Sequence, residues 1–571
     1  MELLAPAKDL DNLKAAFDAG ASAVYLGLKN FSARKRAKNF SFEELYTGLK
    51  FARSINKKIF VAINTLIYEK EIKELFETLF FLEEVGVDGI IIQDYGVYKI
   101  VKDFGISLPL IASTQMATTN SFKAKFLEDL GFKRIILERQ LTLKEIEKIR
   151  NFVNIELEVF IHGAMCFSLS GLCHFSGQIT GKSGNRGECV QPCRWMLEKD
   201  SRDKNFYFSM KDLCGISYLK KLKELGIDSI KIEGRLKGID YTYPVVSAYR
   251  EILDCLEKNS LYNIKLNQIR ERLKNIIQSR ELSEGFFKGL FKSDKLIDKN
   301  PSAGLYIGKI SGVFEKSVYF NTQTELSVGD QIRIVDKYGK ERYKIPVKVI
   351  YKNKLAVKHA YPKDYIGIPY SGARISNGDK IFLVGRRGTY KFKTLKPISL
   401  PENIGYKDKT EIAIKKYESI IFNAQKKTKE TILKFDPEKK SYVINGREFY
   451  FIPAHIFNEN DYRYFSGIKN LLISHPAEAK LLRGPKIYGS FNLYCTNKMA
   501  ALFFKSLGIE GVSWLPDSGE KGKFLNIFPE IMRWKNIPLF ITRVGIKEGD
   551  YFLKDRNLKV AVYSPYGFKK L

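Results

Sequence analysis

Short apolar runs alternate with helical patterns along the first 240 residues of the chain. The runs are apolar at successive positions, which is typical of parallel strands buried on both faces. The segments between most of them, such as FEELYTGLKFARSIN, have the spacing of amphipathic helices. The predicted strands span residues 2–7, 23–28, 59–64, 89–94, 110–114, 134–138, 157–163 and 229–235. Eight strand–helix units predict a closed (β/α)8, TIM-like barrel, with an open doubly wound sheet as the alternative.

Polar side chains stand where these predicted strands end. The carboxyl ends of the strands of a (β/α)8 barrel carry its active site, so the set predicts a functional rim. Any single member could instead be a helix cap or a loop hydrogen bond. The rim residues are Asn64, Asp94, Ser113, Thr114, Gln115, Glu138, Arg139, His162, Glu233 and Arg235.

The pattern changes after the predicted barrel. Residues 303–384 alternate apolar and polar positions in short runs separated by Gly-Asp and Lys-Gly turns, which predicts a small β-barrel. Beyond them the pattern is again mixed α/β. We therefore predict a catalytic barrel at 1–260, a helical connector at 261–302, a small β-barrel at 303–390 and a C-terminal α/β domain at 391–571.

The C-terminal domain contains a partial repeat of the barrel. Residues 111–137 align with 488–515, and the shared frame is a strand, a polar turn, a helix, a glycine cap and a strand. Residues 537–546 also echo residues 157–166, although a generic βα unit could imitate part of this likeness. The matched pairs are Ser113 with Ser490, Asn120 with Asn497 and Gly131 with Gly508. The second copy has no group of four cysteines, so we expect it to serve assembly or binding.

The charge balance points to a polyanionic partner. The 571 residues include 95 Lys and Arg against 64 Asp and Glu, a formal charge of +31. Nucleic acid is the commonest such partner, although a lysine-rich surface without one remains the alternative. The chain begins without a secretory pattern and has no apolar run of about 18 residues, so we expect a cytoplasmic protein without a membrane segment.

Four of the seven cysteines lie within 28 residues, at Cys166, Cys173, Cys189 and Cys193. Cytosolic thiols stay reduced, which favours a metal site over disulfides. Thiolates select zinc or iron–sulfur centres. Structural zinc usually has C-x2-C or C-x4-C pairs, whereas the spacing here is C-x6-C-x15-C-x3-C. The spacing favours a 4Fe-4S cluster and leaves zinc and unligated thiols open.

Charged residues near these cysteines suggest a site for an anion. The glycines of GKSGNRGEC could turn backbone N–H groups toward it, or could merely let the loop fold. Arg186 and Arg194 add donors for carboxylate or phosphate. Lys211, Asp212, Glu233 and Arg235 could bind a carboxylated molecule, or could form a structural ion-pair network. A thiol protease would need a Cys–His pair, for which His162 and His174 are the nearby candidates.

Several motifs resemble those of the peptidase U32, or collagenase-like, family. They are EVFIHGAMC followed by a second cysteine after six residues and by HFS, then SGNRGECVQPCR, FSMKDL and KIEGR. Phe175 departs from the aliphatic residue or tyrosine expected in that signature. The motifs cover about the first 250 residues. The β-rich middle and the C-terminal part resemble, in arrangement, the long branch of 23S rRNA cytidine hydroxylases more than the shorter tRNA uridine hydroxylases.

The resemblance implies an RNA hydroxylase that installs a 5-hydroxyl group on a pyrimidine, with cytidine in 23S rRNA favoured and tRNA uridine as the alternative. It implies prephenate as co-substrate, dependence on the iron–sulfur assembly machinery, and a 4Fe-4S cluster on Cys166, Cys173, Cys189 and Cys193. A collagenase-like peptidase and a zinc-stabilised RNA-binding or assembly factor remain rivals. Candidates for catalysis are Lys211, Asp212, Glu233 and His162, and candidates for binding prephenate are Arg186, Arg194, Lys211 and Arg235.

Overall fold

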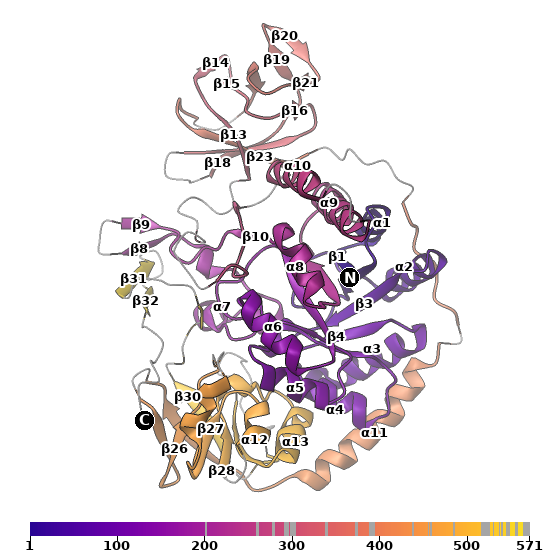
Figure 1. Ribbon diagram of the computed structural model, residues 1–571, viewed down its shortest axis with the longest axis vertical. Helices are drawn as coiled ribbons and strands as arrows, with labels where there is room; N and C mark the ends of the chain where they lie inside the picture. The colour runs from indigo at the N-terminus through magenta and orange to yellow at the C-terminus, as the bar shows by residue number, and fades with distance from the viewer. Residues whose placement is uncertain are drawn as a thin grey trace.

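The computed structural model describes the chain from Met1 to Val562 with gaps (Figure 1). Outside the described residues lie 200–202, 259–261, 277–279, 290–295, 297–303, 337–340, 372–374, 387–393, 403, 437–438, 455, 457–458, 483–485, 515–525, 529, 536, 538, 540, 544–548, 554–557 and 563–571. The domain boundaries predicted at 260/261, 302/303 and 390/391 fall on these residues. Among the helices that the structure describes, none has the length and apolar character needed to cross a membrane.

Eight parallel strands form the predicted closed barrel. They pair in sequence order, and the eighth returns to pair with the seventh and with the first. The strands are β1 (Glu2–Pro6), β2 (Ala23–Gly27), β3 (Lys58–Ile63), β4 (Gly89–Ile92), β5 (Leu110–Ala112), β6 (Arg134–Ile136), β7 (Glu156–Gly163) and β11 (Ser229–Ile232). All eight predicted strands are present, which confirms the barrel and excludes the open sheet.

Helices cover the outside of this barrel, and their start signals are local. Ser41 and Thr142 each accept a hydrogen bond from the backbone of a glutamate three residues later, whose side chain bonds back. Such capping boxes satisfy the free N–H groups of a first turn. The covering helices are α1 (Leu10–Asp18), α2 (Phe42–Ser54), α3 (Ile72–Val85), α4 (Tyr95–Asp103), α5 (Ser121–Asp129), α6 (Leu143–Phe152), α8 (Leu219–Glu224) and α9 (Ile239–Glu257).

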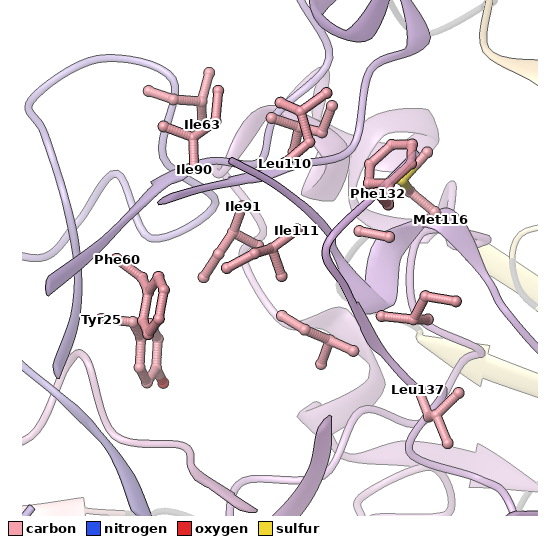
Figure 2. Close-up of a cluster of buried hydrophobic side chains, with 14 of the residues drawn as sticks. Tyr25, Phe60, Ile63, Ile90, Ile91, Leu110, Ile111, Met116, Phe132 and Leu137 are labelled. Atoms are coloured by element: carbon pink, nitrogen blue, oxygen red, sulfur yellow. The ribbon is translucent and has the colours of Figure 1, made fainter. Parts of the chain in front are cut away.

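Successive strand residues face opposite sides of the barrel wall. Figure 2 shows Ile90 and Ile91 on opposite sides of their strand, and the rings of Tyr25 and Phe60 side by side. The strands are therefore apolar throughout, as their sequences predicted. The interior also holds charge: Arg134 contacts Glu158 at 3.0 Å, and Lys231 contacts Glu158 at 2.9 Å.

A long excursion separates β7 from β11 at the rim. It contains the four cysteines, α7 (Phe175–Thr180), β8 (Leu197–Lys199), β9 (Asp203–Asn205) and β10 (Asp212–Cys214). Strand β8 pairs with β31 (Gly549–Leu553), which pairs with β32 (Leu558–Val562). The excursion is thus tied to the C-terminal part of the chain.

The small β-domain has its own hydrophobic core and projects at one end of the molecule (Figure 1). Helix α10 (Tyr262–Lys274) and β12 (Leu282–Ser283) precede it. One sheet contains β13 (Leu305–Lys309), β23 (Lys380–Gly385), β17 (Gln331–Val335) and β18 (Glu341–Pro346). A second contains β14 (Gly312–Phe314), β15 (Ser317–Asn321), β22 (Tyr365–Pro369), β19 (Ile350–Lys352) and β20 (Leu355–Val357). Strands β16 (Leu326–Ser327) and β21 (His359–Ala360) form a third pair.

The C-terminal domain is a seven-stranded, mostly parallel sheet that follows α11 (Tyr406–Ala424). Its strands, in spatial order, are β24 (Lys429–Lys434), β30 (Glu530–Lys535), β29 (Ile509–Ser513), β28 (Lys486–Gly489), β27 (Asn470–Ile473), β26 (Arg447–Phe451) and β25 (Ser441–Ile444). Its helices include α12 (Ala477–Leu481) and α13 (Lys498–Ser506). The structure confirms the predicted repeat, because Ser490, Asn497 and Gly508 occupy the same cap positions as their partners.

One part of the predicted repeat is wrong. Among the described residues, the strand that follows β29 is β30, which ends at Lys535, before the proposed echo at 537–546; residues 538, 540 and 544–546 of that echo lie outside the described residues. The described residues of that echo run against the cysteine-containing excursion instead. The backbone N–H of Leu169 donates to the carbonyl of Ile541 at 2.7 Å, and that of His174 donates to Leu539 at 2.8 Å.

Candidate functional site

The four cysteine thiols gather where the excursion leaves β7. All four side chains are partly buried and free of disulfides. The Cys173 thiol lies within electrostatic reach of the other three. Residues separated by up to 27 positions therefore meet at one place, as the sequence predicted. Cys193 lies in the 3-10 turn η4 (Pro192–Arg194), whereas the other three cysteines lie in loop segments next to β7, α7 and the 3-10 turn η3 (Gly184–Arg186).

Burial and crowding hold three of these thiols in the protonated form. Burial raises the pKa of Cys166, Cys173 and Cys193, that of Cys193 to about 12, and the neighbouring cysteines raise each of them further. Nearby cations act in the opposite direction. Arg139 lowers the pKa of Cys166, and Arg194 lowers that of Cys193. Four thiolates could coexist here only with a positively charged group between them.

The spacing of the thiols bears on which group they fit. Among the described residues, no three His, Cys, Asp or Glu side chains form a group that could hold a metal ion. A structural zinc ion draws its sulfur ligands to about 2.3 Å, so its four thiolates must nearly touch. A 4Fe-4S cluster lies between its four cysteine ligands and holds them further apart. Both groups use four thiolates as ligands, so the choice between zinc and a 4Fe-4S cluster at these cysteines stays a prediction.

A first group of cations surrounds Glu233 at the carboxyl end of the barrel. Arg34 and Arg139 each contact the Glu233 carboxylate at 3.0 Å. Burial alone would raise the pKa of Glu233, but the two arginines hold it at about 2. The guanidinium of Arg139 also stacks 3.7 Å from the ring centroid of Phe160. Arg34 and Arg139 both lie within electrostatic reach of Cys166.

Arg235 completes this group from the KIEGR motif. Its guanidinium donates to the Ser32 hydroxyl at 2.7 Å and to the side-chain oxygen of Asn39. A side chain at Gly27 would clash with it, because a Cβ there would lie 2.3 Å from Nη2 of Arg235. Burial lowers the pKa of Arg235 to about 10, and its buried Nε has no hydrogen-bond partner. The guanidinium keeps capacity to donate to an anion.

A second group of cations surrounds Asp212 beside Cys193. The buried Arg280 contacts the Asp212 carboxylate at 2.6 Å, while its Nε and Nη1 have no hydrogen-bond partner. Arg194 and Lys237 lie within electrostatic reach of both Arg280 and Asp212. Burial, and then the charge of Arg280, lower the pKa of Arg194 to about 10. Arg280 contacts Asp212 directly, and Arg194 and Lys237 add positive charge near it.

Other predicted site residues have different surroundings. Arg186 donates to Glu71 and the carbonyl of Leu66, and it stacks 4.0 Å from the ring centroid of Tyr68. Lys211 contacts Glu281 at 3.4 Å.

His162 contacts helix α9 from β7. Its Nδ1 lies 3.1 Å from the Tyr249 hydroxyl, and burial lowers the pKa of the imidazole to about 3.

Two glycines allow the cysteine-containing excursion to lie against the barrel. A Cβ on Gly171 would lie 2.0 Å from the carbonyl oxygen of Gln115, and one on Gly187 would lie 2.2 Å from that of Ser32. Both glycines also have positive φ angles. The side chain of Asn185 adds bonds to Gly171 and Gln93. In the GKSGNRGEC loop, Asn185, Arg186 and Gly187 therefore anchor the loop itself.

Sequence reasoning did not propose Arg34, Lys237 or Arg280 for this site, and it placed Arg139 only on the rim. Arg280 lies beyond the predicted barrel domain. It reaches Asp212 because β12 pairs with β10, with Leu282 opposite Asp212. No sequence motif predicts the pairing of β10 with β12. Arg139, in contrast, could have been proposed as a site residue because it directly follows the strand predicted at residues 134–138.

The model of the family described as "Peptidase family U32" matches residues 8–295. This chain belongs to that family. An uncharacterized protease of Methanocaldococcus jannaschii is 35% identical over 67% of this chain and 98% of that protein.

Two further relatives of this U32 protein are named for RNA. The tRNA hydroxylation protein P1 of Bacillus subtilis is 35% identical over 50% of this chain and 71% of its own. A 23S rRNA 5-hydroxycytidine synthase of Escherichia coli is 38% identical over 45% of this chain and 40% of its own. The family thus includes proteins named as proteases and proteins named for RNA hydroxylation.

Proposed function

We propose that this protein is an RNA-modifying hydroxylase that adds a hydroxyl group to C5 of a pyrimidine, with cytidine in 23S rRNA the favoured target. The observation that carries the proposal is the gathering of four thiols beside two groups of buried cations at the carboxyl end of the barrel. Relatives named for tRNA and rRNA hydroxylation support it. A tRNA uridine is the alternative target.

In this proposal Cys166, Cys173, Cys189 and Cys193 hold a 4Fe-4S cluster, which the iron–sulfur assembly machinery would supply. The bound cluster would supply one-electron redox chemistry at the rim. Arg139 and Arg194 stabilise the thiolate forms of Cys166 and Cys193, since each lowers the pKa of its neighbour. The second turn of the excursion adds a hydrogen bond, because the N–H of Gln191 donates to the Cys189 sulfur at 3.3 Å.

Prephenate, the proposed co-substrate, carries two carboxylates, and the two groups of cations offer one place for each. Arg235 would bind one carboxylate, and Arg194, Lys237 and Arg280 the other. Free N–H donors on buried arginines favour carboxylate binding, because a charged acceptor relieves their lost hydration. Arg186 is less suited, since Glu71 already neutralises it.

The RNA partner is supported by the charge of the chain and by the needs of the chemistry. A formal charge of +31 favours contact with phosphates. The active site cannot reach C5 of a pyrimidine that is stacked inside a duplex. The enzyme must therefore unstack the target base or act on an unpaired region of the RNA. The rim of the barrel then receives the base beside the thiols.

A peptidase mechanism receives less support from this site. A cysteine nucleophile requires a thiol of lowered pKa beside a histidine base. Here the pKa of Cys166, Cys173 and Cys193 is raised, and His162 is engaged with Tyr249. Cleavage of gelatin by the pure protein, persisting after Cys166→Ser, would favour the peptidase instead.

The decisive experiment is mass spectrometry of rRNA and tRNA from a strain that lacks the gene. We expect one hydroxylated pyrimidine to disappear and to return when the gene is supplied again. Anaerobic purification should give a brown protein with about four irons per chain, as a four-thiolate cluster requires. Unchanged RNA modification would refute the hydroxylase, and a colourless zinc-loaded protein would refute the cluster.

A further inference from the structure

The five-stranded sheet of the small β-domain carries a row of aromatic side chains on its outer face. Phe314 on β14, Tyr319 on β15 and Tyr365 on β22 are neighbours, with 6.0 Å between the ring centroids of each adjacent pair. The rings of Tyr319 and Tyr365 are nearly parallel, at 26°. We call these three residues the aromatic row.

The aromatic row is not part of the core of its domain. Residues that alternate with it, Val318, Phe320, Ile366 and Ile368, are buried in that core. Because strand side chains alternate between faces, the row lies on the opposite, outer face. Phe314 is 64% exposed and Tyr365 is 49% exposed. Grouped exposed aromatics of this kind mark a binding surface more often than scattered ones.

A glycine holds the central ring of the row in place. Gly367 stands directly opposite Tyr319 in the register of β15 and β22. A Cβ on Gly367 would lie 2.6 Å from a ring carbon of Tyr319, so the ring lies across the glycine. An aromatic ring over a strand glycine is a common way to cover exposed backbone. Here it also fixes the ring beside that of Tyr365.

Exposed lysines stand at both ends of the aromatic row. Lys316 is at the tip of the β14–β15 hairpin, directly after the Phe314 end. Lys354, at the tip of the β19–β20 hairpin, and Lys363 lie at the Tyr365 end, because Tyr351 of β19 is opposite Gly367. All three lysines have positive φ angles, a conformation that favours glycine or asparagine. For Lys316 and Lys354 the angle follows from their two-residue hairpin turns, in which both central residues have positive φ.

The charge of the domain matches a polyanion. Residues 305–385 contain 14 Lys and Arg against 7 Asp and Glu. A surface that combines stacked rings with cations at both ends suits unpaired nucleotides, whose bases stack while their phosphates contact the cations. A duplex hides its base faces, and an apolar peptide would gain nothing from the lysines.

We propose that the aromatic row and Lys316, Lys354 and Lys363 bind a single-stranded segment of RNA. The inference rests on the proposed function for the identity of the nucleic acid. Bases stack on Phe314, Tyr319 and Tyr365, and the lysines contact the flanking phosphates. The domain projects from the barrel (Figure 1), so it holds the substrate RNA at a place separate from the thiols.

The test measures binding of the full-length protein to a fluorescein-labelled 12-nucleotide single-stranded RNA by fluorescence anisotropy. The double variant Phe314→Ala/Tyr365→Ala should raise Kd by about tenfold or more, since each stacked base contributes substantially to affinity. The conservative pair Phe314→Tyr/Tyr365→Phe should bind like the unaltered protein. The control Phe422→Ala removes a ring on α11 that is 76% exposed, and it should change Kd less than about twofold.

The lysines have a separate readout. Lys316→Ala and Lys363→Ala should each lower the slope of log affinity against log salt by about 0.7, as loss of one phosphate contact to single-stranded RNA predicts. Unchanged RNA affinity in the Phe314→Ala/Tyr365→Ala variant, or equal weakening by the Phe422→Ala control, would contradict RNA binding by the aromatic row. Equal affinity for an RNA duplex, with the same loss in the variant, would contradict binding of a single-stranded segment.

RNA binding by the aromatic row and the proposed hydroxylase activity are tested by separate outcomes. If RNA from the deletion strain keeps every hydroxylated pyrimidine while the aromatic variant loses RNA affinity, the aromatic row binds RNA and the hydroxylase proposal is wrong. If the deletion strain loses a modification but the aromatic variant binds RNA normally, the hydroxylase proposal is supported and RNA binding by the aromatic row is wrong.

Discussion

The two copies of the internal repeat share their local frame almost residue for residue. Ser113 and Ser490 each cap a 3-10 turn, and Ala117 and Tyr494 each follow it with a positive φ, at 53° and 52°. The side chains of Asn120 and Asn497 then cap the next helix, each accepting from the N–H three residues later. Identical caps at identical separations indicate a duplicated unit, because a generic βα unit needs only some of them.

The same asparagines hold the two copies together. The side-chain amide of Asn120 donates to the carbonyl of Ile456 in the C-terminal domain at 2.9 Å. In return, the side-chain amide of Asn497 donates to the carbonyl of Ile67 in the barrel domain at 3.0 Å. Helix α4 packs on α13, where the rings of Tyr95 and Phe503 stack 4.9 Å apart. The copies therefore meet in a reciprocal way, as two subunits of a symmetric dimer do.

What differs is everything that carries the candidate chemistry. The first copy belongs to a closed barrel, from which the cysteine-containing excursion leaves after β7. The described part of the second copy belongs to a seven-stranded sheet without that excursion. The duplicated frame therefore supplies the scaffold and the interface, while the four thiols and the cations around them belong to the first half.

The strongest test of this comparison replaces a cysteine in each half. Cys166→Ser should abolish the proposed hydroxylation and lower the iron content of anaerobically purified protein, because a 4Fe-4S cluster requires all four thiolates. Mass spectrometry of RNA from complemented deletion strains measures the first effect, and iron analysis measures the second. Cys495→Ala, which removes a buried thiol of the second copy, should leave both unchanged. Equal losses in both variants would contradict a division of labour between the halves.

The barrel could be predicted from the sequence because each strand is a continuous apolar run bounded by helical segments. Errors concern only strand ends: residues 110–114 were predicted as strand, but β5 ends at Ala112 because Ser113 caps a turn. Strand β30 was missed, since Arg533 interrupts its apolar residues and Glu530 and Lys535 bound it. Residues 537–546 are more apolar than β30 and were therefore predicted as the strand that follows β29, which was wrong.

The site was predictable to the extent that its residues are close in sequence. The four cysteines formed a visible cluster, and Glu233 and Arg235 lay in one motif. The partners of these residues come from distant segments: Arg34 follows β2, and Arg280 arrives through the pairing of β10 with β12. Such convergence depends on tertiary packing, which neither periodicity nor composition encodes.

The cations of the first half allow a second test. Arg280→Lys keeps a positive charge for Asp212 but removes the two free N–H donors. We expect the Kd for prephenate, measured by calorimetry on the anaerobic protein, to rise by about tenfold, as loss of a charge-assisted hydrogen bond predicts. Arg272→Lys is the control, because Arg272 pairs with Glu251 on the surface of α10. An unchanged Kd in Arg280→Lys would remove Arg280 from the proposed carboxylate site.

A third test probes what the copies share. Asn120→Ala and Asn497→Ala should each destabilise the protein by about 2 kcal/mol, from the lost cap and the lost bond across the interface. Ser41→Ala removes a cap on α2 within the barrel alone and should cost about 1 kcal/mol. Urea unfolding followed by tryptophan fluorescence measures all three. A marked inequality between the two asparagine variants would show that the interface is not reciprocal.

The smallest expected effect concerns the buried charges at this interface. Burial raises the pKa of Glu478 to about 7 and lowers that of Lys123 to about 8, although each charge favours its partner's charged form. For Glu478 the folded pKa exceeds the unfolded value, so its contribution to stability is complete below pH 4.5 and is lost as pH rises to 7. For Lys123 the folded pKa is depressed, so stability is regained as pH rises from 8 toward 10.5.

The interface should therefore be weakest between about pH 7 and 8, where both groups are charged. Glu478→Gln keeps an oxygen that can accept from the N–H groups of Ser474 and His475, and it removes the titration. Between pH 5 and 7 the Tm of the variant should fall by a few degrees less than the Tm of the unaltered protein. Parallel curves for the two proteins over this range would show that Glu478 stays ionised in the folded chain, and that Lys123 offsets the effect of burial.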